Sequence, residues 1–259
     1  MKIIHLFWHL YLVCEYFLRA WIIGLLHRDP ILKRHILARN VSHSARKFQK
    51  ALGIKLNIFG LEKLLELRNK PYLLVANHSS YTDILILSAL EEFVYITSVE
   101  MGNNPFLGAI TRLGGCLYTD RKNPLSLKEE ISIFSDTIAA GFKVVLFPEG
   151  TSTNGKDIKE FRRSLFQIAL NENCPILPVC IKYTKLDGNE LNDSTRDIIA
   201  WYGDMAFAAH FMKLINHRIE VEIHFLDITY QPNTKSRSEL SDFVYMQMHS
   251  CFHNSEMCS

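Results

Sequence analysis

The sequence predicts an α/β fold in which a central, mostly parallel sheet is covered by helices and preceded by an N-terminal helical hairpin. From residue 72 onward, short apolar runs dominated by Val, Ile, Leu and Phe alternate with stretches of helical periodicity. At 259 residues, 48% of them hydrophobic, the chain can bury the core of one domain and still carry an appendage. The hairpin is predicted separately, because the first 60 residues differ in charge from the rest.

The individual elements follow from this alternation. Strands are expected at residues 72–76, 93–98, 116–119, 143–147, 176–182 and 220–228. Helices are expected at residues 82–90, 125–140, 163–171, 201–215 and 238–252. Such an order favours parallel pairing, and functional residues then gather where strands end and helices begin. We therefore divide the chain into a hairpin segment, residues 1–60, and an α/β domain, residues 61–259.

The hairpin segment is strongly basic on an apolar background. It holds ten Lys and Arg against Glu15 and Asp29, a net charge of +8, so the other 199 residues carry −6 in a chain of net charge +2. Aliphatic and aromatic residues run through the same segment. An anionic membrane surface is therefore favoured as its partner over nucleic acid.

Three topologies are open for this segment. Its longest charge-free run, residues 3–14, has twelve residues, whereas a helical span needs about 20. Glu15 and Arg19 stand four residues apart and are expected to pair on one helix face. We interpret the segment as a membrane-associating hairpin that dips into one leaflet, at the cytoplasmic face of the inner membrane. A helical pair packed on the domain and a single span are the alternatives.

Cysteine and histidine spacing predicts neither a disulfide framework nor a metal site. The six cysteines are scattered and form no C-x-x-C pair, so we interpret them as buried or free thiols. His249 and His253 lie four residues apart near the end of the last predicted helix, but nothing nearby in the sequence completes a metal site. We interpret these two residues as surface or packing residues and expect no metal.

The first of three motifs suited to chemistry follows the predicted strand at residues 72–76. It reads NHSSYTD, residues 77–83, in which His78 and Asp83 can meet if the chain turns into a helix between them. A carboxylate that accepts from one imidazole nitrogen fixes the tautomer and makes the other nitrogen a better base for an alcohol proton. Alone, this spacing is common, and a single His in a turn is usually structural.

The other two motifs also follow or contain short predicted strands. FPEGTS, residues 147–152, offers Glu149 and Gly150, and amides at such a glycine turn can bind phosphate or stabilise an oxyanion. GGCLYTDRK, residues 114–122, ends in Arg121, whose guanidinium suits a phosphate. Taken singly, the two motifs fit an ordinary glycine turn and a solvated charge equally well.

In this order and at these separations, the motifs resemble those of the glycerophospholipid acyltransferases of the lysophosphatidate acyltransferase type. NHSSYTD is similar to the family's N-H-x-x-x-x-D block, GGCLYTDR to its block ending in Arg, and FPEGTS to its F-P-E-G-T block. The Leu-Pro-Val sequence at residues 177–179 is similar to a later apolar-Pro-apolar block. The resemblance runs from about residue 77 to residue 179 and is looser elsewhere.

The resemblance implies an O-acyltransferase that moves a fatty acyl chain from acyl-CoA or acyl carrier protein to the free hydroxyl of a lysolipid, without an acyl-enzyme and without a cofactor. His78, held by Asp83, would deprotonate the hydroxyl, and backbone amides near Gly150 or in the helix after His78 would stabilise the oxyanion. The catalytic residues it implies are His78, Asp83, Glu149 and Gly150. The substrate-binding residues it implies are Asn77, Arg121, Thr151, Ser152 and Pro178. The sequence contains no G-x-S-x-G elbow, which agrees with a mechanism that uses no serine nucleophile.

One departure from the family pattern concerns the acceptor. Many lysophosphatidate acyltransferases have Arg after F-P-E-G-T, where this chain has Ser152, and a family Lys is missing from residues 97–100. The first expectation is 1-acylglycerol-3-phosphate, which would give phosphatidate. The alternative is another lysolipid, such as a lyso-ornithine lipid or a lysophospholipid with a larger head group, and the WYGDM segment at residues 201–205 is similar to that branch. Arg162 and Arg163 are candidates to replace the missing charge. A hydrolase and a non-catalytic lipid-binding protein of the same fold are further alternatives.

Overall fold

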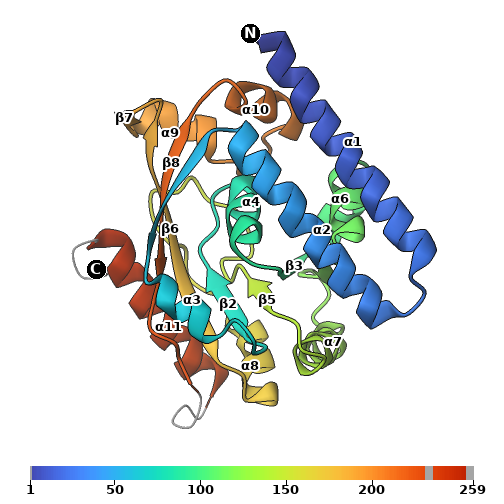
Figure 1. Ribbon diagram of the computed structural model, residues 1–259. Helices are drawn as coiled ribbons and strands as arrows, with labels where there is room; N and C mark the ends of the chain where they lie inside the picture. Colours follow the sequence, from blue (N-terminus) through green and yellow to red (C-terminus); the bar gives the residue numbers. More distant parts are fainter. Residues whose placement is uncertain (1, 231–235, 255–259) are drawn as a thin grey trace.

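The computed structural model describes residues 2–230 and 236–254, and it confirms an α/β fold with a mostly parallel sheet (Figure 1). The strands are β1 (Ile54–Phe59), β2 (Leu73–Ala76), β3 (Val94–Ser98), β4 (Leu117–Thr119), β5 (Val144–Leu146), β6 (Ile176–Leu186), β7 (Asn189–Glu190) and β8 (Ile219–Phe225). The longer helices are α1 (Lys2–Leu26), α2 (Pro30–Ala51), α4 (Tyr81–Leu90), α7 (Leu127–Ala139), α10 (Phe207–Leu214) and α11 (Arg237–His253). The shorter helices are α3 (Leu61–Glu66), α5 (Val99–Asn103), α6 (Leu107–Leu113), η1 (Arg163–Phe166), α8 (Gln167–Glu172) and α9 (Asp193–Ile199).

The sheet runs in the order β1-β8-β6-β2-β5-β3-β4, with β7 paired to β6. Strands β2, β3, β4 and β5 are parallel to their neighbours, and β6 is parallel to β2. The exception is the pairing of β6 with β8 and β7, which is antiparallel. Because β2, β5, β3 and β4 are mutually parallel, their carboxyl ends lie along one edge of the sheet, which is where the sequence motifs are found.

Successive residues of β2 face opposite layers, as the pleat of a strand requires. Leu73 and Val75 pack with α7, α8 and α11, whereas Leu74 and Ala76 pack with α4, α3 and α10. All four are fully buried. This explains why β2 appears in the sequence as a continuous apolar run, since a strand covered on both faces has no polar side.

Three parts of the secondary structure differ from the prediction. Residues 54–59, which we expected in the hairpin segment, form β1 and pair in parallel with β8 at the edge of the sheet. The helix expected at residues 201–215 is shortened to α10, because Gly203 adopts a φ of +59° that an α-helix does not accommodate. The helix expected at residues 163–171 consists of η1 followed by α8.

The N-terminal helices α1 and α2 form a hairpin that packs on the domain through α4 and α6 (Figure 1). Glu15 pairs with Arg19 at 3.5 Å, as expected, and also with Lys47 of α2 at 2.5 Å. The Tyr16 hydroxyl donates to the Ile110 carbonyl of α6 at 2.8 Å. One face of α1 is therefore attached to the protein along its length.

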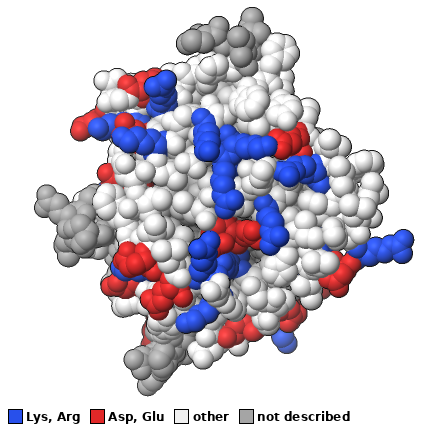
Figure 2. Space-filling model, in the orientation of Figure 1, with Lys and Arg blue, Asp and Glu red and all other residues white. Residues whose placement is uncertain are grey.

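The opposite face of α1 is apolar and exposed. Its exposed residues include Phe7, Trp8, Leu10, Tyr11, Leu18, Trp21, Ile22, Leu25 and Leu26, and we call this set the α1 apolar face. Figure 2 shows basic side chains gathered in the middle of this view, over α2, while the edge where α1 lies is largely free of charge. By length and composition, the segment His5–Leu26 could cross a membrane.

Candidate active site

The site is built at the junction between β2 and α4. Ser80 adopts an extended backbone and caps α4, with its hydroxyl accepting from the Thr82 amide and the Asp83 carboxylate accepting from the Ser80 amide. This capping box fixes Asp83 in the first turn of the helix. His78, five residues earlier, is thereby brought back over the helix start.

The predicted contact between His78 and Asp83 is present. His78 Nδ1 lies 2.8 Å from Asp83 Oδ2, with the His78 side chain 17% exposed and the Asp83 side chain fully buried. The imidazole also stacks on the Phe147 ring, at 4.2 Å between centroids and an interplanar angle of 20°. Carboxylate and ring together fix the imidazole, and within the described residues Nε2 has no hydrogen-bond partner. A partly exposed nitrogen on an imidazole held in this way suits a general base.

Asp83 is held as a carboxylate by donors from several directions. Besides His78, its Oδ2 accepts from the amides of Ser79 at 2.8 Å and Ser80 at 2.9 Å. Its Oδ1 accepts from the Tyr183 hydroxyl of β6 at 2.5 Å. Hydrogen bonds to the charged form offset the cost of burying a carboxylate. The negative charge is therefore fixed beside the imidazole.

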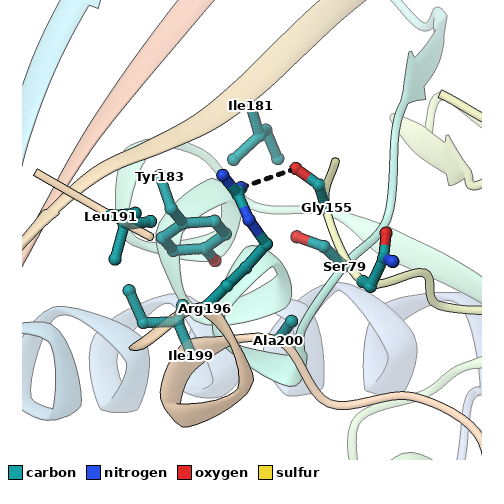
Figure 3. A pocket seen from close by; sticks show the side chains of 9 residues that line it. Ser79, Gly155, Ile181, Tyr183, Leu191, Arg196, Ile199 and Ala200 are labelled. Atoms are coloured by element: carbon teal, nitrogen blue, oxygen red, sulfur yellow. Dashed lines mark hydrogen bonds between the residues drawn. The ribbon is translucent and has the colours of Figure 1, made fainter. Parts of the chain in front are cut away.

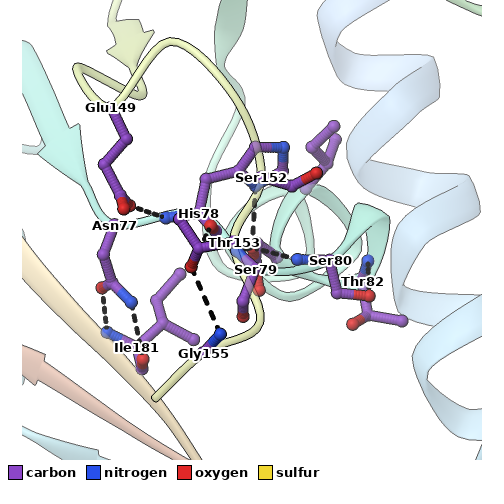
Figure 4. A network of polar contacts seen from close by, with 12 residues as sticks. Asn77, His78, Ser79, Ser80, Thr82, Glu149, Ser152, Thr153, Gly155 and Ile181 are labelled. Carbon is purple, nitrogen blue, oxygen red and sulfur yellow. Dashed lines mark hydrogen bonds and ion pairs between the residues drawn. The ribbon is translucent and has the colours of Figure 1, made fainter. Parts of the chain in front are cut away.

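Glu149 holds the His78 loop through a hydrogen bond to its backbone (Figure 4). Its Oε1 accepts from the His78 amide at 2.6 Å, and its Oε2 accepts from the Lys159 amide at 2.8 Å. The residue is 2% exposed, and this burial raises the pKa of its carboxyl to about 7. Both oxygens accept from backbone amides, so Glu149 positions the His78 loop, and its expected catalytic role stays a prediction.

Gly150 stands at a turn that only glycine fits well. Its φ is +69°, and an added Cβ would lie 2.6 Å from Arg162 Nε. Thr151 and Ser152 follow on the same loop, exposed and half-buried respectively, and within the described residues their amides have no hydrogen-bond partner. These amides are available for a ligand.

The other expected substrate-binding residues lie elsewhere. Asn77 is buried and exchanges two hydrogen bonds with the Ile181 backbone, at 2.9 and 2.7 Å, so it ties β2 to β6. Pro178 is buried within β6 opposite Val75. Arg121 lies at the site's edge of the sheet but pairs with Glu100 at 3.7 Å. Its strand β4 is three positions from β2, about 14 Å at the usual strand spacing.

Sequence reasoning missed two residues that hold the site. Tyr183 binds Asp83 from a strand 100 positions away, and only the folded sheet brings them together. Thr153 donates to the His78 carbonyl through its amide at 2.9 Å and its hydroxyl at 3.2 Å. Thr153 follows FPEGTS directly, and this position was the one feature of the sequence from which its role could have been predicted.

A small cavity lies behind the His78 loop, between Ser79, Gly155, Tyr183 and Arg196 (Figure 3). Arg196 reaches across it to donate to the Gly155 carbonyl at 2.9 Å. The cavity volume is about 10 Å³, which is room for about one water molecule. It is too small for an acyl chain.

The arrangement of a base, a buried carboxylate and a glycine turn agrees with the comparisons to known proteins. A family model described as Acyltransferase matches residues 55–182, which include all three motifs. Over these 128 of its 259 residues, the chain is similar to the acyltransferase family. This confirms the resemblance drawn from the motifs.

Among relatives of this acyltransferase, the lyso-ornithine lipid O-acyltransferase of Rhizobium meliloti is 29% identical over 74% of this chain and 68% of its own length. The lyso-ornithine lipid O-acyltransferase of Rhodobacter capsulatus is 31% identical over 55% of this chain, which spans about half (51%) of that relative. The crystal structure of the 1-acyl-sn-glycerophosphate acyltransferase PlsC from Thermotoga maritima superposes with a TM-score of 0.67. The superposition covers 99% of this chain and 98% of the PlsC chain at 18% sequence identity, and it therefore supports the fold.

Proposed function

We propose that this acyltransferase transfers a fatty acyl chain from acyl-CoA or acyl carrier protein to the free hydroxyl of a lysolipid at a membrane surface. The observation that carries the proposal is the His78–Asp83 pair, 2.8 Å apart. Among the residues that the structure describes, the second imidazole nitrogen and the nearby amides of Thr151 and Ser152 have no hydrogen-bond partner. A base next to an oxyanion site is what transfer of an acyl group to an alcohol requires.

In the proposed reaction, His78 Nε2 takes the proton of the acceptor hydroxyl as its oxygen attacks the thioester carbonyl. Asp83 stabilises the imidazolium that forms, because its charge is fixed 2.8 Å away. The tetrahedral intermediate then collapses and breaks the C–S bond. The proton on His78 goes to the leaving thiolate, which restores the neutral imidazole. No acyl-enzyme and no cofactor take part in this proposal.

The oxyanion would be stabilised by the amides that follow Gly150. Gly150 turns the chain at φ +69°, and the amides of Thr151 and Ser152 come next on the same loop. Thr153 bonds the His78 carbonyl, which keeps this loop against the base. Backbone donors at such a turn suit an anion whose charge develops during the reaction.

The position of Arg162 favours an acceptor whose head group is anionic. It is exposed and lies against Gly150, and within the described residues it forms no ion pair. Arg163 instead pairs with Asp242 at 3.0 Å. A guanidinium beside the FPEGT turn can bind a phosphate or a carboxylate, and so offset the absence of a cation at Ser152. The candidate acceptors are 1-acylglycerol-3-phosphate and lyso-ornithine lipid, and Ser152 together with the relatives named above favours the second.

The hairpin supports attachment to one leaflet at the cytoplasmic face. Because α1 is packed along α2 and α6, a spanning α1 would bring the exposed Arg39, Arg46 and Lys50 of α2 close to the hydrocarbon, which is costly. With the α1 apolar face lying in the interface, these cations can stay among the head groups. The donors are cytosolic and the basic hairpin suits an anionic leaflet.

The test uses the protein purified in mild detergent with labelled acyl-CoA or acyl carrier protein. The acceptor panel contains 1-acylglycerol-3-phosphate, lyso-ornithine lipid and lysophosphatidylcholine. We expect one acceptor to gain label, and we expect His78→Ala to transfer the acyl chain about a thousandfold more slowly, in the middle of the range for loss of a general base. His217→Ala is the matched control, because His217 also pairs with an Asp (Asp187, 2.7 Å) but lies at a distant edge. Acylation of none of these lysolipids, or full activity of His78→Ala, would refute the proposal.

A further inference from the structure

The second half of α11 brings two imidazoles against one carboxylate that lies far away in the sequence. His253 Nε2 lies 2.9 Å from Asp157 Oδ1, and His249 Nε2 lies 3.5 Å from the same oxygen. The ligand atoms of the three residues all lie within 4.8 Å of one another. His249 and His253 had lacked a third partner in the sequence, and Asp157 supplies it from the loop between β5 and η1.

The two distances to Asp157 fit a tetrahedral metal centre. With metal–ligand bonds of about 2.0–2.2 Å, neighbouring ligand atoms around a tetrahedral zinc ion lie about 3.3 Å apart. The two distances to Asp157, 2.9 and 3.5 Å, lie on either side of that value. Histidines four residues apart on a helix lie on one face, an arrangement that zinc sites use repeatedly.

The ligand set also selects the class of cation. Two imidazoles and one carboxylate suit zinc and similar transition metals, whereas Mg²⁺ and Ca²⁺ prefer oxygen ligands throughout. The Asp157 carboxylate is fixed by its own turn, since Oδ1 accepts from the amide of buried Ile158 at 2.7 Å. The three side chains are 40–60% exposed, so a metal can enter and water can complete its coordination.

We propose that Asp157, His249 and His253 bind one zinc-class divalent cation that fastens α11 to the loop between β5 and η1. Two residues after Asp157, the Lys159 amide donates to Glu149, which in turn holds the His78 amide. The cation thereby steadies the loop that supports the base, and it takes no part in acyl transfer. The proposal stands whether or not the acceptor is a lysolipid.

The test is binding of Zn²⁺ or Co²⁺ alone to tag-free, full-length protein that has been stripped with a chelator in detergent. We expect one equivalent of Zn²⁺ by isothermal titration, a melting temperature that rises with Zn²⁺ concentration, and the intense visible absorption of tetrahedral Co²⁺. His249→Gln/His253→Gln and, separately, Asp157→Asn are expected to weaken binding more than about 100-fold, beyond the effect of an outer-shell change.

Two controls make the result specific. His217→Gln removes a His–Asp ion pair with a single imidazole, and it is expected to bind Zn²⁺ as the wild type does. The melting temperatures of the metal-free variants show whether each still folds, and the Asp157 variant provides a second route if the double His variant does not. The proposal is overturned if the wild type binds no stoichiometric Zn²⁺, if a folded ligand variant retains wild-type affinity, or if His217→Gln loses binding equally.

Discussion

Asp83→Asn separates the charge of the Asp83 side chain from its geometry. The carboxamide is isosteric, and its oxygen can take the place of Oδ2, accepting from His78 Nδ1 and from the amides of Ser79 and Ser80. Its NH₂ group then faces the Tyr183 hydroxyl, which can accept and still donate to Thr82 Oγ1, now 2.6 Å away. The hydrogen bonds and the imidazole tautomer are therefore preserved, and the negative charge is lost.

The expected loss of rate follows from the distance. Two unit charges about 3 to 4 Å apart interact by about 4–6 kcal/mol at an effective dielectric constant of about 20. Asp83 is fully buried, but the imidazole is 17% exposed, so water screens part of this interaction. If about 3–4 kcal/mol is retained as stabilisation of the imidazolium in the transition state, the rate of acyl transfer falls about 10²–10³-fold.

The assay compares kcat/KM for acyl transfer with the free energy of unfolding. Tyr183→Phe is the matched control, since it removes one hydrogen bond to the same carboxylate and leaves its charge. That variant should lose about 1.5–3 kcal/mol of stability and keep most of its rate. If Asp83→Asn keeps more than a tenth of wild-type kcat/KM while folded, the Asp83 charge does not stabilise the transition state and the proposed role is wrong.

Three further predictions follow from the site and the hairpin. The pKa of Glu149 is raised from 4.5 to about 7, so its contribution to stability is present below pH 4.5 and is lost as pH rises through about 7. The free energy of unfolding of Glu149→Gln, measured with denaturant, should therefore rise by about 3 kcal/mol relative to that of the wild type between pH 4 and pH 8. A difference between the two proteins that does not change with pH would contradict this. Arg162→Ala should raise KM for an anionic acceptor about tenfold or more with little change in kcat, whereas Arg163→Ala, which breaks the pair with Asp242, should not. Trp8→Glu and Trp21→Glu should each weaken binding to anionic vesicles by about 2 kcal/mol in sedimentation assays, whereas Leu125→Glu, at a residue 90% exposed between β4 and α7, should not.

The central strands could be predicted because each of them is covered on both faces. Residues of β2, β5 and the first half of β6 are buried in succession, so each appears as an unbroken apolar run bounded by polar residues. The edge strand β1 carries Lys55 and Asn57 between apolar residues and so has no such unbroken run, and its residues were included in the basic hairpin segment. The order of strands could not be predicted, because it depends on contacts between segments far apart in the chain.

In the site, local contacts were predictable and distant ones were not. His78 and Asp83 meet through a capping box that four consecutive residues define. Tyr183 reaches Asp83 from 100 residues away, and Asp157 meets His253 across 96 residues. A catalytic role was expected for Glu149 because FPEGTS resembles the F-P-E-G-T block of the family. Glu149 turns inward because two backbone amides, of His78 and Lys159, need an acceptor there.

The loop between β5 and η1 contacts His78 through the His78 backbone. Glu149 and Thr153 bind the amide and the carbonyl of His78, and the Gly155 carbonyl receives Arg196. None of these contacts uses the His78 ring, whose Nε2 therefore stays available to an acceptor. Substitutions in this loop should consequently change the position of the base, and with it the rate of transfer, without removing any group that reacts. The same reasoning explains how a cation at Asp157, 2.7 Å from the Ile158 amide, could influence acyl transfer while lying outside the site.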